Sequence, residues 1–270
     1  MTGNKLDTLI HNLKSLESAL LAFSGGTDST FLLKAMQLSG IRSLAVTATS
    51  ETMPGNDLLN AKTMAKELGI EHRIIHTEEL AREDFISNTP ERCLFCKDER
   101  FGRMKEIALA EGYDFLLDGA NHDDLSDYRP GRKAAKKHLV RSPLTEAGFS
   151  KKEIREFSRE LSLPTWDRPS SPCLATRIPY GQRITKDALL RIERAEKFLR
   201  SLGLHEVRVR DHNGVARIEI GENEIDRFLL SGKRALVSQR LKSFGYPYVS
   251  LDLDGFQSGS MNRDLDPGDG

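Results

Sequence analysis

The sequence predicts an α/β fold: a parallel five-stranded sheet covered by helices, with a second, smaller α+β domain after it. Short apolar segments alternate with helical patterns over residues 1–148, and this alternation favours a parallel sheet because parallel strands need crossover connections. A proline-rich segment at 164–179 then interrupts regular structure, and a hairpin pattern lies beyond it. A chain of 270 residues is also longer than one small core requires.

The predicted strands of the first domain are short segments that contain apolar or β-branched residues. The run ALLAF at 19–23 is uninterrupted, which is typical of a strand buried on both faces. The other predicted strands are 43–49, 71–77, 113–118 and 138–142. Helical patterns cover 57–68 and 92–110, with Gly69 and Gly112 at the positions of helix C-caps.

The second half of the chain begins with a capping-box pattern, Ser150 with Glu153, which opens a helix reaching about residue 161. Beyond the proline-rich segment, a helix is predicted at 186–202, followed by strands at 206–211 and 215–220 around an Asn213-Gly214 turn. The end of the chain carries almost no apolar residues. The predicted ranges are 1–148 for the first domain, 149–180 for a linker helix and cysteine-containing loop, 181–257 for the second domain and 258–270 for a disordered tail.

Lysine plus arginine and aspartate plus glutamate both number 40, so the formal net charge is zero. No global field therefore favours nucleic acid or an anionic membrane, and neither partner is expected. The N-terminus lacks a basic region followed by an apolar run, and no stretch approaches the ~18 apolar residues of a membrane helix, so we expect a cytoplasmic protein. Three cysteines are too few for a disulfide framework, which favours thiol chemistry or metal ligation.

Residues 24–30, SGGTDST, form a candidate phosphate loop between the first predicted strand and the helix after it. Successive backbone N–H groups and the helix dipole can bind an anion there, and Gly25 and Gly26 permit its close approach. Asp28, at the helix start, can cap N–H groups or reach a magnesium ion. The residues alone also fit an ordinary helix entry.

A second candidate segment, GANHDDLSDYRPG at 119–131, follows the strand predicted at 113–118. In a parallel sheet the carboxyl ends of the strands form the edge where ligands bind. Asp124 and Asp127 are therefore candidates to hold Mg²⁺ opposite the phosphate loop. The alternative is that these Asn and Asp residues only make turns and a helix cap.

The cysteines form a pair and a single residue. Cys93 and Cys96 lie three apart near the start of a predicted helix, where thiolate pKa values are lowered, and Cys173 lies in RPSSPCLATR. Three thiolates are one fewer than a closed zinc or iron–sulfur site uses, so a bound cluster would keep a position open for sulfide. The alternative is that two cysteines fill a core and the third is incidental.

The segment SGGTDST resembles the signature of the PP-loop ATP pyrophosphatases, and together with GANxDDxxDYRPG, SSPCLATR and the upstream CxxCK it resembles the LarE family over nearly the whole chain. This resemblance implies an oligomeric sulfur transferase that uses ATP and Mg²⁺. Such an enzyme adenylylates a carboxylate of a pyridinium dicarboxylate mononucleotide, then replaces AMP with sulfur to give a thiocarboxylate for a nickel-pincer cofactor.

The resemblance also implies roles for individual residues. In one branch of the family a cysteine matching Cys173 gives up its own sulfur, whereas in another three cysteines hold a [4Fe–4S] cluster with an extra sulfide as the donor. The presence of Cys93 and Cys96 matches the cluster branch, with Cys173 as third ligand. The implied catalytic residues are Cys173, Asp28, Arg177, Glu196, Arg208 and Arg210, and the implied nucleotide-binding residues are Ala22, Phe23, Ser24, Gly25, Gly26, Thr27, Asp28, Ser29, Thr30, Thr47, Gly119, Asn121, Asp124 and Asp127.

Three alternatives stay open. Arg208 and Arg210 alternate along VRVRD, which also describes the solvent face of a strand. A tRNA thiolase with an iron–sulfur cluster would share the loop and the cysteines, although the balanced charge weighs against RNA binding. A nucleotide-sensing module with a structural metal site is the non-enzymatic alternative.

Overall fold

The computed structural model describes residues 3–125 and 130–257. The chain forms two compact units, the first made of residues up to Glu79 and of Glu91–Ser171, the second of Leu80–Pro90 and residues from Pro172 onward. Each unit is therefore discontinuous in sequence, because a short excursion at 80–90 packs with the second half of the chain. The ranges predicted from the sequence are continuous, so they do not assign residues 80–90 to the second unit.

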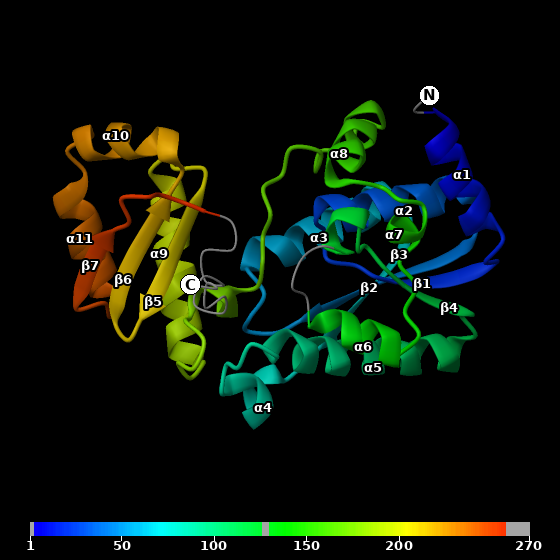
Figure 1. Cartoon of the computed structure of the whole chain (residues 1–270), viewed down its shortest axis with the longest axis horizontal. Helices are drawn as coiled ribbons and strands as arrows, with labels where there is room; N and C mark the ends of the chain where they lie inside the picture. Colours follow the sequence, from blue (N-terminus) through cyan, green and yellow to red (C-terminus); the bar gives the residue numbers. More distant parts are fainter. Residues whose placement is uncertain (1–2, 126–129, 258–270) are drawn as a thin grey trace, which may run out of the picture. The chain divides into compact units, whose positions relative to one another are not determined.

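The first unit is built on a parallel sheet in the order β3-β2-β1-β4 (Figure 1). Its strands are β1 (Ser18–Ala22), β2 (Arg42–Thr49), β3 (Glu71–His76) and β4 (Phe115–Asp118). Leu21 of β1 lies beside Ala45 of β2 and Leu117 of β4. The central strand is buried on both faces, as its apolar run predicts. Four of the five predicted strands are thus present.

The fifth predicted strand, 138–142, is wrong: within the described residues it contributes only one parallel bridge, between Leu117 and Arg141. The Asp118 N–H donates to the Arg141 carbonyl oxygen, and the Arg141 N–H donates to that of Leu116, both at 2.9 Å. Leu139 has a left-handed φ of 58°, and α7 (Pro143–Glu146) begins just beyond the bridge. Extended backbone is therefore too short there to form a strand.

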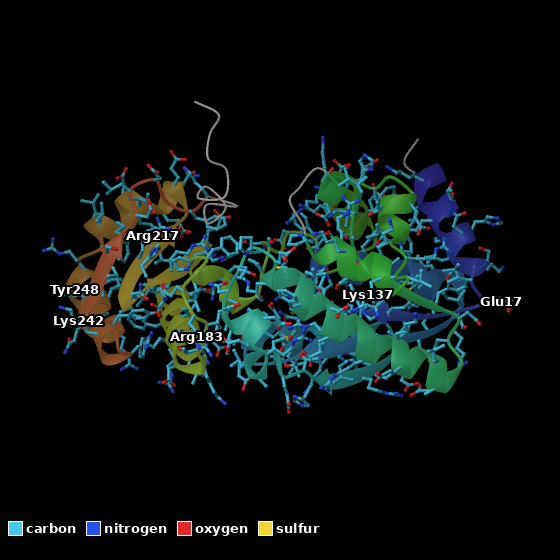
Figure 2. The ribbon with its side chains drawn as sticks, turned by 60° about the horizontal axis from the view of Figure 1, so that its bottom comes forward. Glu17, Lys137, Arg183, Arg217, Lys242 and Tyr248 are labelled. Carbon is cyan, nitrogen blue, oxygen red and sulfur yellow. The ribbon has the colours of Figure 1, made fainter. Side chains whose placement is uncertain are left out.

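Helices cover both faces of this sheet (Figure 1). On one face lie α1 (Gly3–Lys14), α2 (Thr27–Ser39), α3 (Gly55–Glu67) and α8 (Lys151–Glu160), whose apolar side chains pack on β1 and β2 around Phe31 and Phe149. On the other face lie α5 (Arg92–Glu111) and α6 (Gly131–Lys137), packed through Phe101 and Ala134. Lys137, labelled in Figure 2, joins α6 to α5 by an ion pair with Asp98 at 2.8 Å.

Several helix ends follow the predicted local chemistry. The Glu153 N–H donates to Ser150 Oγ at 3.3 Å, and the Ser150 N–H donates to Glu153 Oε2 at 2.8 Å, which confirms the capping box. Gly69 and Gly112 follow α3 and α5 in the left-handed conformation, with φ of 63° and 69°. The remaining short helices are η1 (Glu79–Ala81), α4 (Glu83–Ile86), η2 (His122–Leu125) and η3 (Leu174–Arg177). No helix in the described ranges has both the length and the apolar character needed to cross a bilayer.

The second unit contains a mixed three-stranded sheet in the order β5-β6-β7. The strands β5 (Val207–His212) and β6 (Val215–Ile220) form the predicted antiparallel hairpin, and β7 (Tyr248–Leu251) pairs with β6 in parallel. Asn213 and Gly214 both have positive φ, as a tight hairpin turn requires. The helices of this unit are α9 (Lys186–Ser201), α10 (Glu222–Leu230) and α11 (Arg234–Ser243).

Candidate nucleotide-binding and cysteine sites

The candidate phosphate loop, residues 24–30, joins the carboxyl end of β1 to α2. Gly26 is the N-cap of α2 and offers no side-chain oxygen; side-chain caps are present at α8 and α9 but are also lacking at helices such as α3 and α5. No side chain therefore caps the first N–H groups of α2. Together with the helix dipole, they favour an anion at this point.

Two glycines let neighbouring backbone approach the loop. Gly25 has φ of +71°, and a Cβ there would lie 2.8 Å from the backbone N and Cα of Ala61 in α3. A Cβ on Gly119, just after β4, would lie 3.0 Å from the backbone of Ser29. Across the loop, Ser24 Oγ and Ser29 Oγ are 2.9 Å apart. Substitution at either glycine would therefore displace the loop.

Asp28 and Asn121, predicted from different segments, are in direct contact at this edge of the sheet. Asn121 Nδ2 donates to Asp28 Oδ2 at 2.8 Å, so Asp28 accepts from a side chain. Burial raises the pKa of Asp28, and the nearby Asp124 carboxylate raises it further, against the effect of the Asn121 hydrogen bond. A cation bound between Asp28 and Asp124 would offset the unfavourable free energy of burying their negative charges together.

Asp124 is buried and fixed beside Asn121. The Asn121 N–H donates to Asp124 Oδ2 and the Asp124 N–H donates to Asn121 Oδ1, each at 3.2 Å, while Lys151 Nζ lies 3.3 Å from Asp124 Oδ1. Oxygen donors of this kind fit Mg²⁺, which is bound through one or two carboxylates together with phosphates. Asp127, the other predicted ligand, lies outside the described residues.

The backbone expected to face the base, at Phe23 and Thr47, is supported by a histidine that the sequence reasoning missed. Thr47 Oγ1 donates to the Phe23 carbonyl oxygen at 2.8 Å and lies 2.8 Å from His72 Nε2. Because a hydroxyl has one proton, this geometry assigns the donor role in the second bond to His72 Nε2. Burial lowers the pKa of His72, with Lys62 lowering it further, which favours the neutral ring. No local signal marked His72, because Glu71 and Arg73 on either side of it are polar as well.

Arg168 and Asp57 were also missed: Arg168 contacts the loop, and Asp57 pairs with Arg168. Arg168 Nη1 donates to the Gly25 carbonyl oxygen at 3.0 Å, and Arg168 Nη2 pairs with Asp57 Oδ1 at 2.6 Å. Thr27 Oγ1 donates to the Thr165 carbonyl oxygen at 2.7 Å. Only tertiary structure brings residues so distant in sequence together.

Cys93 and Cys96 lie in the first turn of α5, as predicted, and belong to the first unit, whereas Cys173 belongs to the second. All three are partly buried, and none of them forms a disulfide bond. Cys96 Sγ donates to the carboxylate of Glu79 at 3.4 Å. Thiolates are the ligands that iron–sulfur clusters use, so the chemistry of the pair fits one. Over the described residues, no group of three or more potential metal ligands is assembled.

Arg177 and Glu196 form a fully buried ion pair in the second unit. Arg177 Nε and Nη2 donate to the two Glu196 carboxylate oxygens at 2.8 and 3.1 Å, while Nη1 donates to the backbone oxygens of Pro172 and Cys173 at 2.8 and 3.2 Å. Burial opposes ionisation of Glu196, but Arg177 and Arg200 lower its pKa. This geometry fixes the turn that carries Cys173.

Arg208 and Arg210 are also buried, so the alternative of a solvent-facing strand is wrong. Arg210 Nε and Nη2 donate to Glu219 Oε2 at 2.9 and 2.7 Å, and Nη1 donates to the Thr176 carbonyl oxygen at 3.0 Å. Arg208 lies over the Phe256 ring at 5.0 Å. Burial, and then the charge of Arg177, lower the pKa of Arg208 to about 10, so it stays charged at neutral pH. The structure therefore gathers the predicted second-domain residues into one cluster.

Comparison with known proteins places the chain in a family. It is 43% identical to an uncharacterized protein of Synechocystis sp., covering 98% of this chain and 99% of the relative. It is 40% identical to the pyridinium-3,5-bisthiocarboxylic acid mononucleotide synthase of Lactiplantibacillus plantarum, covering 97% and 95%. A tRNA-specific 2-thiouridylase MnmA of a Wolbachia species is 23% identical, covering 76% and 65%. No family model matches the chain. The chain belongs to the LarE family, that of the Lactiplantibacillus plantarum synthase.

Proposed function

We propose that the protein is an ATP-dependent sulfur transferase. It adenylylates a carboxylate of pyridinium-3,5-dicarboxylate mononucleotide, releases pyrophosphate, and replaces AMP with sulfur to give a thiocarboxylate for a nickel-pincer cofactor. The near full-length identity to the Lactiplantibacillus plantarum synthase supports the substrate class. The single structural observation that carries the proposal is the glycine-capped start of α2, where Asp28 bonds to Asn121 and Asn121 bonds to Asp124.

In the first step, the loop residues bind and orient the nucleotide. Backbone N–H groups at the start of α2, with the Ser24 and Ser29 hydroxyls, hold the outer phosphates in line with the attacking carboxylate. Asp28 and Asp124 would hold Mg²⁺, which when bound neutralises phosphate charge. The backbone after β1 and β2, at Ala22, Phe23 and Thr47, would face the adenine.

In the second step, a sulfur nucleophile attacks the acyl carbon and AMP leaves. Cys93, Cys96 and Cys173 would hold a [4Fe–4S] cluster, which when bound would supply the sulfide. In the same scheme the buried cluster of Arg177, Glu196, Arg208 and Arg210 would stabilise the anionic groups of the substrate and position Cys173. A cytoplasmic homo-oligomer remains part of the proposal.

The test is an anaerobic assay of the full chain with ATP, Mg²⁺, sulfide and the dicarboxylate mononucleotide. We expect AMP and pyrophosphate in equal amounts, dependent on the mononucleotide, and a product whose mass shows oxygen replaced by sulfur. Formation of ADP, or AMP formation indifferent to the mononucleotide, would contradict the proposal.

A tRNA thiolase is the second candidate, because the chain is similar to MnmA proteins over much of its length. Such an activity would make AMP formation depend on tRNA and would give binding with a steep salt dependence. Replacing the mononucleotide with bulk tRNA in the same assay distinguishes the two. We expect no stimulation, because the net charge is zero.

A further inference from the structure

The segment 165–171 lies against the candidate phosphate loop through several independent contacts. Its Thr165 carbonyl oxygen accepts from Thr27 Oγ1 at 2.7 Å, and its Arg168 donates to the Gly25 carbonyl oxygen at 3.0 Å. Its Ser171 Oγ donates to Asp57 Oδ2 at 2.9 Å. The segment is thus fixed to both ends of the loop's glycine turn and to the helix α3 beside it.

Arg168 is held in place on three sides. Nη2 pairs with Asp57 at 2.6 Å, Nη1 bonds to Gly25, and the Arg168 backbone oxygen accepts from Arg155 at 2.8 Å. The Arg168 and Asp57 side chains are 19% and 13% exposed. Among the described contacts, two of the five guanidinium N–H donors of Arg168 are engaged. A fixed, partly buried guanidinium with donors left over is suited to binding an anion at the loop.

The charges around the loop leave room for such a group. Residues 24–30 contain no lysine or arginine, and the negative charges of Asp28 and Asp124 are opposed by Lys151 and Arg155. Cleavage between the α- and β-phosphates places further negative charge on the leaving group. Backbone N–H dipoles stabilise part of this charge, and a guanidinium beside Gly25 would stabilise more of it.

We propose that Arg168 binds the pyrophosphate as it leaves, and that Asp57 is the positioning residue that holds Arg168. The inference rests on the proposed adenylylation. In that step a carboxylate oxygen forms a bond to the α-phosphorus, and the bond from that phosphorus to the bridging oxygen breaks. The electron pair leaves with pyrophosphate, which Arg168 contacts through its remaining donors.

The test measures binding of pyrophosphate with Mg²⁺, and separately of AMP, to the full chain by titration calorimetry. Arg168→Ala should weaken pyrophosphate binding at least about tenfold and leave AMP binding within about twofold, because AMP lacks the outer phosphates. Arg168→Lys, which keeps the charge without the fork, should lie between. Arg159→Ala is the matched control: Arg159 packs over Trp166 of the same segment, at 5.8 Å, and should change neither affinity.

Asp57→Asn separates positioning from charge. If Asp57 holds Arg168, this variant should weaken pyrophosphate binding severalfold, and the double variant with Arg168→Ala should bind no more weakly than Arg168→Ala alone. Tighter binding by Asp57→Asn would overturn the positioning role, since it would mean that Asp57 only opposes the anion. Thermal melting confirms that each variant is folded. If Arg168→Ala does not fold, Arg168→Lys still tests the proposal.

The outcomes distinguish this inference from the function on which it rests. Wild-type protein that binds neither ligand would contradict the nucleotide loop itself. Wild-type protein that binds both, with Arg168→Ala and Arg168→Lys unchanged in pyrophosphate affinity, would contradict only the role of Arg168.

Discussion

A methyl group at position 25 would meet the backbone of α3, and this makes Gly25 a sharp test of the loop. Gly25→Ala should cost about 2–5 kcal/mol, because the left-handed φ of +71° strains any other residue and the added Cβ would lie 2.8 Å from Ala61. It should also abolish nucleotide binding. Denaturant unfolding and ATP titration measure the two effects.

Gly40 provides the matched control for that substitution. It ends the same helix α2 with nearly the same φ, +72°, but nothing lies within 4 Å of an added Cβ. Gly40→Ala should therefore lower the free energy of unfolding only by the backbone strain of the left-handed conformation, about 1–2 kcal/mol, and leave nucleotide binding intact. Equal effects of the two substitutions would show that contact with α3 does not shape the loop.

Asp28 should reveal a conflict between stability and activity. Its folded-state pKa is raised above the ordinary 3.8, mainly by burial, so ionised Asp28 destabilises the folded protein increasingly as pH rises above 3.8. Asp28→Asn should therefore raise the Tm of the ligand-free protein at pH 7 by about 2 °C, an advantage that shrinks as pH falls towards 3.8, while activity falls about a hundredfold. Melting curves across this pH range, with the AMP assay, check both. If Asp28→Asn is less stable than the wild-type protein at pH 7, the predicted destabilisation by ionised Asp28 is wrong.

At the level of elements, the start of α8 carries a pH-dependent contribution to stability. Hydrogen bonds from Lys5 of α1, aided by those from Ser150, lower the pKa of Glu153 from 4.5 to about 2. A lowered carboxyl pKa gives stability that is present above pH 4.5 and lost as pH falls towards 2. Glu153→Ala should therefore cost about 1 kcal/mol at pH 7, and progressively less below pH 4.5.

Glu153→Gln serves as its control, because glutamine keeps the capping hydrogen bond but loses the ion pair with Lys5 at 2.7 Å. It should cost less than Glu153→Ala at pH 7. Urea unfolding at several pH values measures both variants. A cost of Glu153→Ala that does not change between pH 7 and 3 would contradict the role of the charge.

The same elements show how much the sequence could predict. Local chemistry sufficed for the buried run of β1, the cap at Ser150 and the Asn213-Gly214 hairpin, because each is decided by residues within a few positions. The fifth strand failed because Leu139 adopts a left-handed φ and Pro143 starts a helix; the proline is visible in the sequence, but the backbone conformation of Leu139 is not. Arg168 and His72 were missed because their contacts, Gly25 and Thr47, are far away in sequence. Motif residues such as Asp28 and Asn121 could therefore be predicted, whereas Arg168 and His72 could not.

At the scale of the whole molecule, the proposed cluster is tested through its three cysteines. If Cys93, Cys96 and Cys173 hold a cluster, anaerobic reconstitution should give about four irons per chain, and Cys93→Ala should lose most of this iron and its turnover. Glu106→Ala, at an exposed position further along α5, should retain both. Full turnover by Cys93→Ala, with mass spectrometry showing one sulfur lost from Cys173, would contradict the cluster and identify a sacrificial donor.

The most direct test of the central claim follows one oxygen atom. When the dicarboxylate substrate carries oxygen-18 in its carboxylates, attack on the α-phosphorus followed by displacement with sulfur must leave a labelled oxygen on AMP. Mass spectrometry of AMP after turnover should therefore show one oxygen-18 for each sulfur transferred. Unlabelled AMP, or label in inorganic phosphate, would mean that the loop between β1 and α2 does not direct adenylylation of the carboxylate.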